Sequence, residues 1–512
     1  MGVIILAGAG ILAAAWRLFD WVWRRPKSLE RALRRQGLSG NPYRLLFGDI
    51  RDYSKMLTEA KSKPIPFTND YFSRVRPFHH QTINNYGKSS FIWLGPMPMV
   101  QVTEPELMRE VLNKFNDYQK PKTNPLFALA VPGLVQYEGD KWSKHRKLIN
   151  PAFHMEKLKV MLPAFHASCD EMITKLEEMV PRTGSHELDV WPYLATLTAD
   201  VISRAAFGSN YEDGRRIFEL LREQTSLIVQ YSTSVYVPGW RYLPTKTNRR
   251  LSTINIEIQT MIRGLINKRK QEMEAGEGHN DDLLGLLIES SVDIIQKNGI
   301  SMNFDKMTVN EVIDECKLFY FAGQETTSVL LVWTMIMLGK HQDWQEQARE
   351  EVLRTFGNKS PDFDGLNHLK TVTMILYEVL RLYPPVVELR RRVYNNINLG
   401  KLSLPAGALV SLPIILAHYD HQFWGEDAEE FKPERFSEGI SKATKGNVSF
   451  FPFSWGPRIC IGQNFALVEA KFALAMILQR FCFELSSSYT HAPSTSPILQ
   501  PQYGAHIVLR RL

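Results

Sequence analysis

"FPFSWGPRICIG", residues 451–462, places one cysteine in a short loop that also holds two glycines and an arginine. The fixed positions of this loop, spaced F-x-x-G-x-R-x-C-x-G, are Phe453, Gly456, Arg458, Cys460 and Gly462. The two glycines allow a tight turn and the close approach of a flat object to the backbone. Because an apolar helical pattern follows directly, the helix N-terminus is expected to favour the thiolate form of the cysteine.

The other side chains of the loop suit a flat, anionic ligand. Arg458 lies two residues from Cys460 and can pair with an acidic group of that ligand, while Phe453 and Trp455 offer flat apolar cover. A thiolate, an arginine and aromatic cover together predict haem, with sulfur on the iron and guanidinium on a propionate. A buried structural cysteine is the alternative. A chance match at five fixed positions has a frequency of roughly one in ten thousand, which favours haem.

Composition limits the classes of function. The chain has 512 residues, enough for one large domain or two ordinary ones, and its net charge is +7. Acidic residues are abundant and no basic block contains interleaved aromatics, so no nucleic-acid partner is expected. The four cysteines show no C-x-x-C spacing, which argues against a disulfide framework or a zinc site and favours a reducing compartment. These cysteines are Cys169, Cys316, Cys460 and Cys482.

The N-terminus predicts a membrane anchor. "MGVIILAGAGILAAAW", residues 1–16, is apolar, and "RRPK" at 24–27 closes the stretch after Arg17 and Asp20. A cleaved signal peptide is the rival interpretation, but no basic segment precedes the apolar run. Basic residues after the run predict that the remainder stays cytoplasmic. We therefore expect an uncleaved anchor at 1–24.

Beyond the anchor, we expect a basic, Pro/Gly-bearing connector at 25–60 and one large domain at 61–512. Apolar spacing with a period of 3.6 predicts long helices at 154–180, 188–208, 249–275, 308–339, 341–356 and 463–481. Short strands are predicted at 90–95, 98–103, 399–413 and 506–512. The fold class is therefore mainly α with small β-sheets. Neither a G-x-G-x-x-G fingerprint nor a phosphate-binding loop is present, so no nucleotide should bind directly.

The chain resembles the cytochrome P450 superfamily, the haem-thiolate monooxygenases, over essentially its whole length after the anchor. Three segments are most similar to the plant secologanin synthase-like group: "GLSGNPYRLLFGD" at 37–49, "GWRYLPTKTNRR" at 239–250 and "AGQETT" at 322–327. The resemblance implies a single haem domain behind the anchor helix. It also implies haem b as cofactor, with Cys460 as the axial ligand of the iron.

Glu325 and Thr326 match the acid–alcohol pair of that family and are the predicted catalytic residues. The Thr326 hydroxyl can donate to the carbonyl of Ala322 and open the helix locally, and Gly323 would leave room there for dioxygen and water. Cleavage of the O–O bond consumes protons, so a hydroxyl fed by a carboxylate has a clear role. An ordinary threonine beside a solvated glutamate is the alternative.

Glu378 and Arg381 match the E-x-x-R of the family, a pattern that this chain also contains elsewhere. Context distinguishes this copy, because a Pro-Pro turn follows it and "FKPERF", with Arg435, precedes the cysteine loop. The resemblance makes Glu378, Arg381 and Arg435 a buried charge network that braces the loop. That role is structural, and removing one member of such a network commonly costs about 3–5 kcal/mol.

The resemblance also implies residues that contact the haem propionates. Trp142 and Arg146, four residues apart on one helical face, match such a pair, and Arg391 is a further candidate with Arg390 and Arg392 as alternatives. Lysines on the same side could attract the acidic flavin domain of a reductase. These lysines are Lys141, Lys144, Lys147, Lys442 and Lys445.

The predicted function is a haem-thiolate monooxygenase that takes electrons from NADPH through a cytochrome P450 reductase and inserts one oxygen atom into a hydrophobic small molecule. The related group suggests a terpenoid substrate, with hydroxylation in one or several steps or with C–C cleavage. A haem-thiolate isomerase or dehydratase that does not use dioxygen is one alternative, and a haem sensor or electron carrier is another. We expect a monomer in the endoplasmic reticulum membrane, with a single span and a cytoplasmic catalytic domain. Cavity walls are expected from 121–137, 319–322, 386–389 and 498–503.

Overall fold

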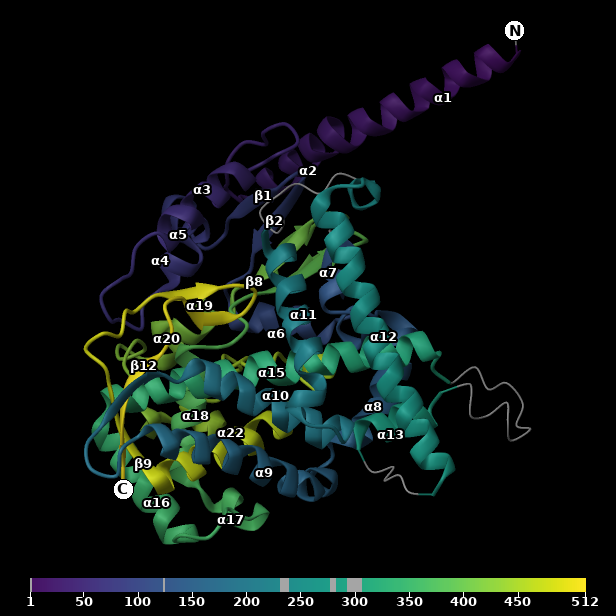
Figure 1. Cartoon of the computed structure of the whole chain (residues 1–512). Coiled ribbons are helices and arrows are strands. Elements are labelled where there is room, and N and C mark those ends of the chain that lie inside the picture. The colour runs from purple at the N-terminus through teal and green to yellow at the C-terminus, as the bar shows by residue number, and fades with distance from the viewer. Residues whose placement is uncertain (1, 123–124, 231–238, 277–281, 292–305) are drawn as a thin grey trace.

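The computed structural model describes residues 2–122, 125–230, 239–276, 282–291 and 306–512, and within them helices dominate (Figure 1). The predicted fold class, mainly α with small β-sheets, is therefore confirmed. The helices up to the middle of the chain are α1 (Gly2–Phe19), α2 (Arg25–Arg34), α3 (Ile50–Lys61), α4 (Phe72–Val75), α5 (Pro77–Tyr86), α6 (Pro105–Asn113), α7 (Pro125–Ala130), α8 (Gly139–Ile149), α9 (Met155–Met179), α10 (Trp191–Phe207), α11 (Tyr211–Gln230), α12 (Lys246–Glu274) and α13 (Leu283–Glu289).

The helices that follow are α15 (Val309–Lys340), α16 (Gln342–Phe356), α17 (Phe363–His368), α18 (Lys370–Leu382), α19 (Ile414–Tyr419), α20 (His421–Trp424), α21 (Ile440–Ala443) and α22 (Gln463–Arg480). Short non-α turns are η1 (Asp20–Arg24), η2 (Gly133–Val135), η3 (Asn150–Phe153), η4 (Trp240–Tyr242), η5 (Pro433–Phe436) and η6 (Gly456–Arg458).

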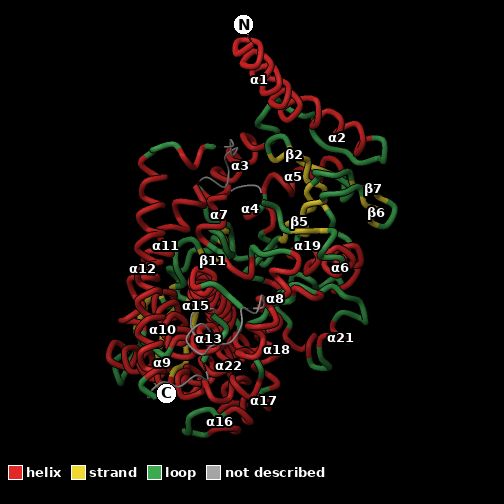
Figure 2. Tube along the Cα trace, turned by 90° about the vertical axis from the view of Figure 1, so that its right-hand side faces the viewer, coloured by secondary structure: helices red, strands yellow, loops and turns green. Residues whose placement is uncertain are grey.

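The strands of the described residues form four small sheets (Figure 2). Five strands are ordered β1-β2-β8-β5-β3, three are ordered β4-β12-β9, and the pairs β10-β11 and β6-β7 are hairpin-like. The strands are β1 (Phe91–Leu94), β2 (Met97–Gln101), β3 (Tyr118–Gln119), β4 (His186–Asp189), β5 (Leu389–Val393), β6 (Ile397–Leu399), β7 (Leu402–Leu404), β8 (Leu409–Leu412), β9 (Phe481–Leu485), β10 (Pro493–Thr495), β11 (Leu499–Pro501) and β12 (His506–Arg511). In the five-stranded sheet, only the β2–β8 pair is parallel.

Helix α15 runs through the centre of the helical layer and packs against α10 and α22 (Figure 1). A capping box fixes its start, because the Thr308 side chain accepts from the Glu311 backbone and the Glu311 side chain accepts from the Thr308 backbone. Almost every side chain from Thr327 to Gly339 is buried. A helix that is apolar on all sides belongs in a core. The packing around α15 therefore fixes the position of its central residues.

The predicted helix boundaries differ from the structure by at most three residues, with α12 starting at Lys246 rather than at 249, and two of the differences involve strand β12. The segment 188–208 begins with the end of strand β4, and α10 starts only at Trp191, next to Pro192 in its first turn. The segment 463–481 ends at Arg480, because Phe481 opens β9 and pairs with Arg511 of β12. In both places, a strand that pairs with the C-terminal strand β12 adjoins the helix and sets its boundary. Periodicity within one segment carries no signal of such a partner.

The N-terminal helix α1 extends away from the rest of the chain in both views (Figures 1 and 2). Among the residues that the structure describes, no helix is both long and apolar enough to cross a bilayer. The single span at 1–24 therefore stays a prediction. Further along, Leu33 and Leu38 pack in one cluster with Phe91 and Trp93, so part of the segment 25–60 lies against the body. The division at residue 61 is likewise a prediction.

Candidate functional site

The cysteine loop is folded tightly between α6 and α22. The Cys460 N–H donates to the carbonyl of Phe453 at 2.9 Å, which closes the loop two residues before Gly462, the N-cap of α22. Gly456 has φ +72°, and a Cβ on it would lie 2.7 Å from Oδ1 of Asn113. A glycine is therefore required at 456.

The second predicted glycine is held less tightly. Gly462 has φ −91°, and a Cβ on it would meet only the ring of Phe153, at 3.9 Å. Neither the backbone angle nor a close neighbour in the chain demands glycine there. The Phe153 ring beside it stacks on Phe319, with ring centroids 5.3 Å apart.

The thiol of Cys460 carries exposed surface, yet protein surrounds it. Burial raises the pKa of this thiol, and this outweighs a hydrogen bond from the backbone of Gly462 and the positive charge of Arg146, which both lower it. The amide at the start of α22 therefore favours the thiolate, as expected, while burial opposes it in the chain alone. A metal cation bound at this exposed cysteine would displace the thiol proton.

Four cationic side chains lie close to one another beside the cysteine loop. Arg146 on α8 donates to the carbonyl of Ile459, next to the cysteine, at 2.8 Å. Arg458 pairs with Glu138 and donates to the carbonyl of Tyr137 at 3.0 Å. Its guanidinium also lies over the ring of Trp142, 4.4 Å from the centroid, so the predicted Trp142, Arg146 and Arg458 do come together.

The other two cations are Lys120 and Arg391. Lys120 donates from Nζ to the carbonyl of Val135 at 2.6 Å, and Arg391 donates to the carbonyl of Arg390 at 2.9 Å. The Nε of Arg391 is buried without a partner. Sequence reasoning missed Lys120, since one lysine before a proline in "YQKPKTNP" carries no signal of its own.

The four cations repel one another. Burial, then repulsion by Arg391 and Arg458, lowers the pKa of Lys120 to about 7, and burial with repulsion by Arg458 lowers the pKa of Arg391 to about 10. Glu138 is the one carboxylate, in the described part of the chain, that forms an ion pair with any of them. A flat dianion with a central metal cation would relieve this repulsion and engage the thiol. The residues present therefore fit haem.

The three consecutive arginines of β5 have different partners. Arg390 pairs with Glu388 at 2.9 Å, and Arg392 lies over the ring of Tyr394 at 5.2 Å. Of these three arginines, Arg391 is the one named among the charges that lower the pKa of Lys120. This geometry favours Arg391 over its two neighbours as a propionate contact.

Glu325 and Thr326 lie in the middle of α15. The Thr326 hydroxyl donates to the carbonyl of Ala322 at 2.8 Å, as expected, but the helix continues without interruption, so the predicted local opening is absent. On the side of Gly323 where a Cβ would lie, Cγ1 of Ile202 on α10 would be 2.6 Å away, and the expected space for dioxygen stays a prediction. The role of Gly323 is the close packing of α10 on α15. Burial raises the pKa of Glu325, which suits a group that must carry a proton.

Glu378, Arg381 and Arg435 form a buried network. Arg381 donates two hydrogen bonds to the Glu378 carboxylate, at 2.7 and 2.8 Å, and Nε of Arg435 lies 3.4 Å from the same carboxylate. The backbone N–H of Lys432 completes the shell at 2.9 Å. Arg435 also pairs with Asp427 at 2.7 Å, so the network extends to the segment before the cysteine loop.

His418 connects this network to the loop itself and was missed from the sequence. Its Nδ1 lies 2.9 Å from the carbonyl of Arg381, and the N–H of Phe451 lies 2.9 Å from its Nε2. A neutral imidazole that donates from Nδ1 and accepts at Nε2 satisfies both groups. Burial lowers its pKa to about 3, so it stays neutral. A lone histidine in an apolar stretch gives no sequence signal of this role.

The α3–β5 cavity is a hollow of about 860 Å³ between α3, α7 and β5. It takes residues from two of the predicted wall segments, 121–137 and 386–389, and includes Lys120 and Arg391. The segments 319–322 and 498–503 are not among its described walls, whereas α3 and Thr495 are. The cavity therefore adjoins two of the four cations near the cysteine loop, Lys120 and Arg391. Positions 123 and 124 of the predicted wall lie outside the described residues.

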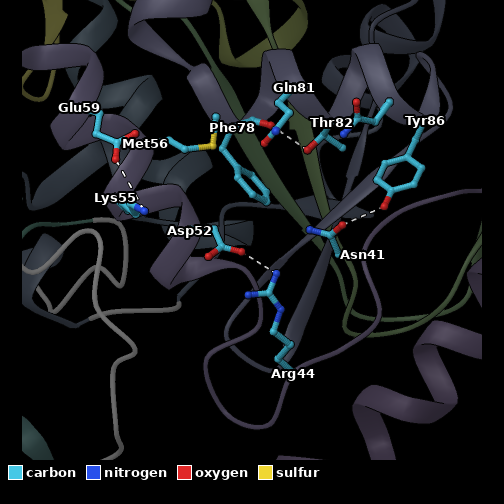
Figure 3. Close-up of a pocket in the computed structure, with 11 residues that line it drawn as sticks. Asn41, Arg44, Asp52, Lys55, Met56, Glu59, Phe78, Gln81, Thr82 and Tyr86 are labelled. Atoms are coloured by element: carbon cyan, nitrogen blue, oxygen red, sulfur yellow. Dashed lines mark hydrogen bonds and ion pairs between the residues drawn. The ribbon is translucent and has the colours of Figure 1, made fainter. Parts of the chain in front are cut away.

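A smaller hollow of about 400 Å³ lies between α3, α5 and the segment before α3 (Figure 3). Its polar side chains satisfy one another: Arg44 pairs with Asp52 at 2.6 Å, and the Tyr86 hydroxyl donates to Asn41 at 2.9 Å. None of the predicted site residues lines it. It is therefore no part of the candidate site.

Comparison with known proteins agrees with this geometry. The family model for cytochrome P450 matches residues 69–508. The chain is 61% identical over 503 residues to Cytochrome P450 CYP72A219 of Panax ginseng, covering 98% of this chain and 97% of that protein. It is 57% identical over 506 residues to Echinocystic acid 23-monooxygenase of Saponaria officinalis, with 98% and 97% covered. It is 53% identical over 504 residues to Secologanin synthase 1 of Catharanthus roseus, with 98% and 96% covered.

Proposed function

The chain belongs to the cytochrome P450 family, whose members use haem iron, and from this we propose a monooxygenase that inserts one atom of dioxygen into a terpenoid. The observation that carries the proposal is the exposed Cys460 in a glycine-bearing loop, with the guanidinium of Arg146 beside it and Arg458, Arg391 and Lys120 close to one another. When bound, the haem would activate dioxygen and transfer one oxygen atom to the substrate. NADPH supplies the electrons through a reductase.

In this proposal the chain holds the cofactor from two directions. Cys460, in the loop that Phe453 and Gly456 close, would be the thiolate ligand of the iron. Arg146, Arg391, Arg458 and Lys120 would hold the propionates, and Trp142 supports the guanidinium of Arg458. Glycine at 462 leaves space for the macrocycle.

Glu325 and Thr326 deliver protons. The raised pKa of Glu325 keeps its carboxyl protonated at higher pH than that of an exposed glutamate. Thr326 keeps its hydroxyl oriented by its hydrogen bond to Ala322 and can pass a proton onward. A haem-thiolate isomerase or dehydratase that does not use dioxygen needs no such relay, so this pair favours the monooxygenase.

We propose the substrate, the partners and the location by analogy with the relatives. The names of two relatives refer to a triterpenoid acid and to secologanin, which supports a terpenoid substrate and leaves open one hydroxylation, several steps or C–C cleavage. We propose a monomer anchored in the endoplasmic reticulum membrane by residues 1–24, with the catalytic domain in the cytoplasm beside an NADPH–cytochrome P450 reductase.

The first test is the absorption spectrum of the reduced protein with carbon monoxide. Thiolate ligation predicts a strongly red-shifted Soret band that Cys460→Ser abolishes. Cys482→Ser is the matched control. Cys482 lies in β9, beyond α22 from the cysteine loop, so its replacement should leave the band unchanged. An unshifted band in the parent protein would remove the central residue of this proposal.

A further inference from the structure

Two cations of the α3–β5 cavity converge on one threonine. Lys61, the last residue of α3, donates from Nζ to the carbonyl of Thr495 at 3.2 Å. Arg76, between α4 and α5, donates to the hydroxyl of the same residue at 3.1 Å. All three residues line the cavity. Two positive side chains from different elements are thus held close together at one wall.

The charges at this wall are not balanced. In the described part of the chain no carboxylate forms an ion pair with Lys61, and Arg76 shares Glu388 with Arg390, at 3.4 and 2.9 Å. Burial, together with repulsion from Arg76 and Arg74, lowers the pKa of Lys61. Glu388 is the one acidic residue among the described cavity walls. A bound anion would relieve this repulsion.

The remaining walls are largely apolar. They include Leu57 of α3, Leu94 of β1, Phe127 of α7, Val229 of α11 and Leu389 of β5. A cavity of about 860 Å³ with this lining suits a polycyclic hydrocarbon skeleton, and the cations suit one acidic group on it. A fully exposed cation would bind an acidic group only weakly, since water and salt would screen its charge.

We propose that Lys61 and Arg76 bind a carboxylate of the substrate, so that the enzyme selects terpenoid acids over their neutral counterparts. This inference rests on the proposed function and deepens it, because it assigns the substrate class of the same site. The same cavity reaches Lys120 and Arg391 of the haem side. An acid held at Lys61 and Arg76 therefore extends its skeleton along the apolar walls toward the cofactor.

The test is equilibrium dialysis of the full-length holoenzyme against two acids and their methyl esters, namely echinocystic acid and abietic acid. Methylation removes the charge and leaves the skeleton intact. We expect at least one acid to bind about tenfold more tightly than its ester, and Lys61→Met to abolish that preference while the ester binds as before. Lys61→Arg should keep the preference.

Lys55→Met is the matched control, because Lys55 lies on the same helix but lines the other hollow (Figure 3). Equal binding of acid and ester, equal weakening of both by Lys61→Met, or binding of neither acid would overturn the proposal. The carbon monoxide band separates the two proposals: a thiolate band without acid preference rejects only the carboxylate site. A missing band rejects the monooxygenase, while dialysis still reports on acid binding.

Discussion

Lys120 is a half-buried lysine whose ionisation depends on its neighbours. Its pKa of about 7 reflects burial and the repulsion of three guanidinium groups, so a propionate beside it would restore its charge. We expect Lys120→Met to speed haem loss about tenfold, measured by transfer to apomyoglobin. Lys122→Met, two residues away at an exposed position, should release haem at the parent rate. Equal rates in all three proteins would argue against a propionate contact at Lys120.

Glu325 supports a prediction about pH. Its pKa is raised by burial, and proton delivery needs the protonated carboxyl, so product formed per NADPH should fall as pH rises through that pKa. Glu325→Gln cannot release a proton, and we expect a loss of about 100-fold in coupled turnover together with loss of this pH limb. Turnover with purified reductase between pH 5 and 9 measures both. A limb that persists in Glu325→Gln would assign it to another group.

Thr326→Val is the companion variant at the residue scale. It keeps the size and β-branching of the side chain but removes the hydroxyl that donates to Ala322. We expect NADPH consumption to continue while product formation drops and hydrogen peroxide accumulates. Thr334→Val, which loses a similar hydrogen bond to Leu330 two turns further along α15, should stay coupled. Parent-like coupling in Thr326→Val would exclude its hydroxyl from proton delivery.

At the scale of elements, α18 and the cysteine loop are joined through α19. His418 spans the carbonyl of Arg381 and the N–H of Phe451, and Arg381 is itself fixed by Glu378. The loop that presents Cys460 is therefore braced by a helix more than 70 residues earlier in the chain. The physical reason is that buried backbone groups and charges must all find partners.

His418→Leu tests this brace. Loss of the imidazole leaves two buried backbone groups unpaired, at roughly 1–3 kcal/mol each, so we expect a lower midpoint in urea and incomplete haem incorporation. His421→Leu, in the next helix at a half-exposed position, should behave as the parent does. Because burial holds the pKa of His418 near 3, the brace should not respond to pH between 5 and 8. Full haem content in His418→Leu would show that the brace is dispensable.

At the scale of the whole molecule, the surface that flanks the cysteine loop is the expected reductase side. Helix α8 reaches the loop through Arg146, and α21 precedes the loop in the chain. Of the lysines predicted there, Lys147, Lys442 and Lys445 are exposed and form no ion pair within the described residues, and Lys141 is exposed too. Lys141 pairs with Glu311 at 2.7 Å, and Lys144 donates to the carbonyl of Lys306, so these two already have intramolecular partners.

Reversing the charges of Lys147, Lys442 and Lys445 should therefore weaken reductase binding. We expect the triple change Lys147→Glu, Lys442→Glu and Lys445→Glu to raise the KM for reductase roughly tenfold at low salt, with convergence toward the parent at 0.5 M salt. Lys55→Glu, an exposed change on α3, is the control. A salt-independent defect would indicate altered folding instead, and an unchanged KM would place the docking surface elsewhere.

Much of this protein could be predicted from local sequence. The cysteine loop, the E-x-x-R pair and the acid–alcohol pair lie within short segments, because a ligand loop or one helical turn needs its residues at fixed spacing. The long helices α9, α12, α15 and α16 were predicted to within a few residues, since a buried helical face repeats every 3.6 positions. Family membership follows from the order of these motifs.

Other features depend on contacts between distant segments, and only the tertiary structure decided them. Strand pairing with β12 set the start of α10 and the end of α22, and the packing of Ile202 explains Gly323. Lys120 and His418 acquire their roles from neighbours that are remote in the chain. Lys61 and Arg76 likewise meet only where α3 and β10 fold together. Charge repulsion, burial and hydrogen-bond satisfaction are properties of such three-dimensional neighbourhoods, whereas spacing within a helix or a loop is already a property of the sequence.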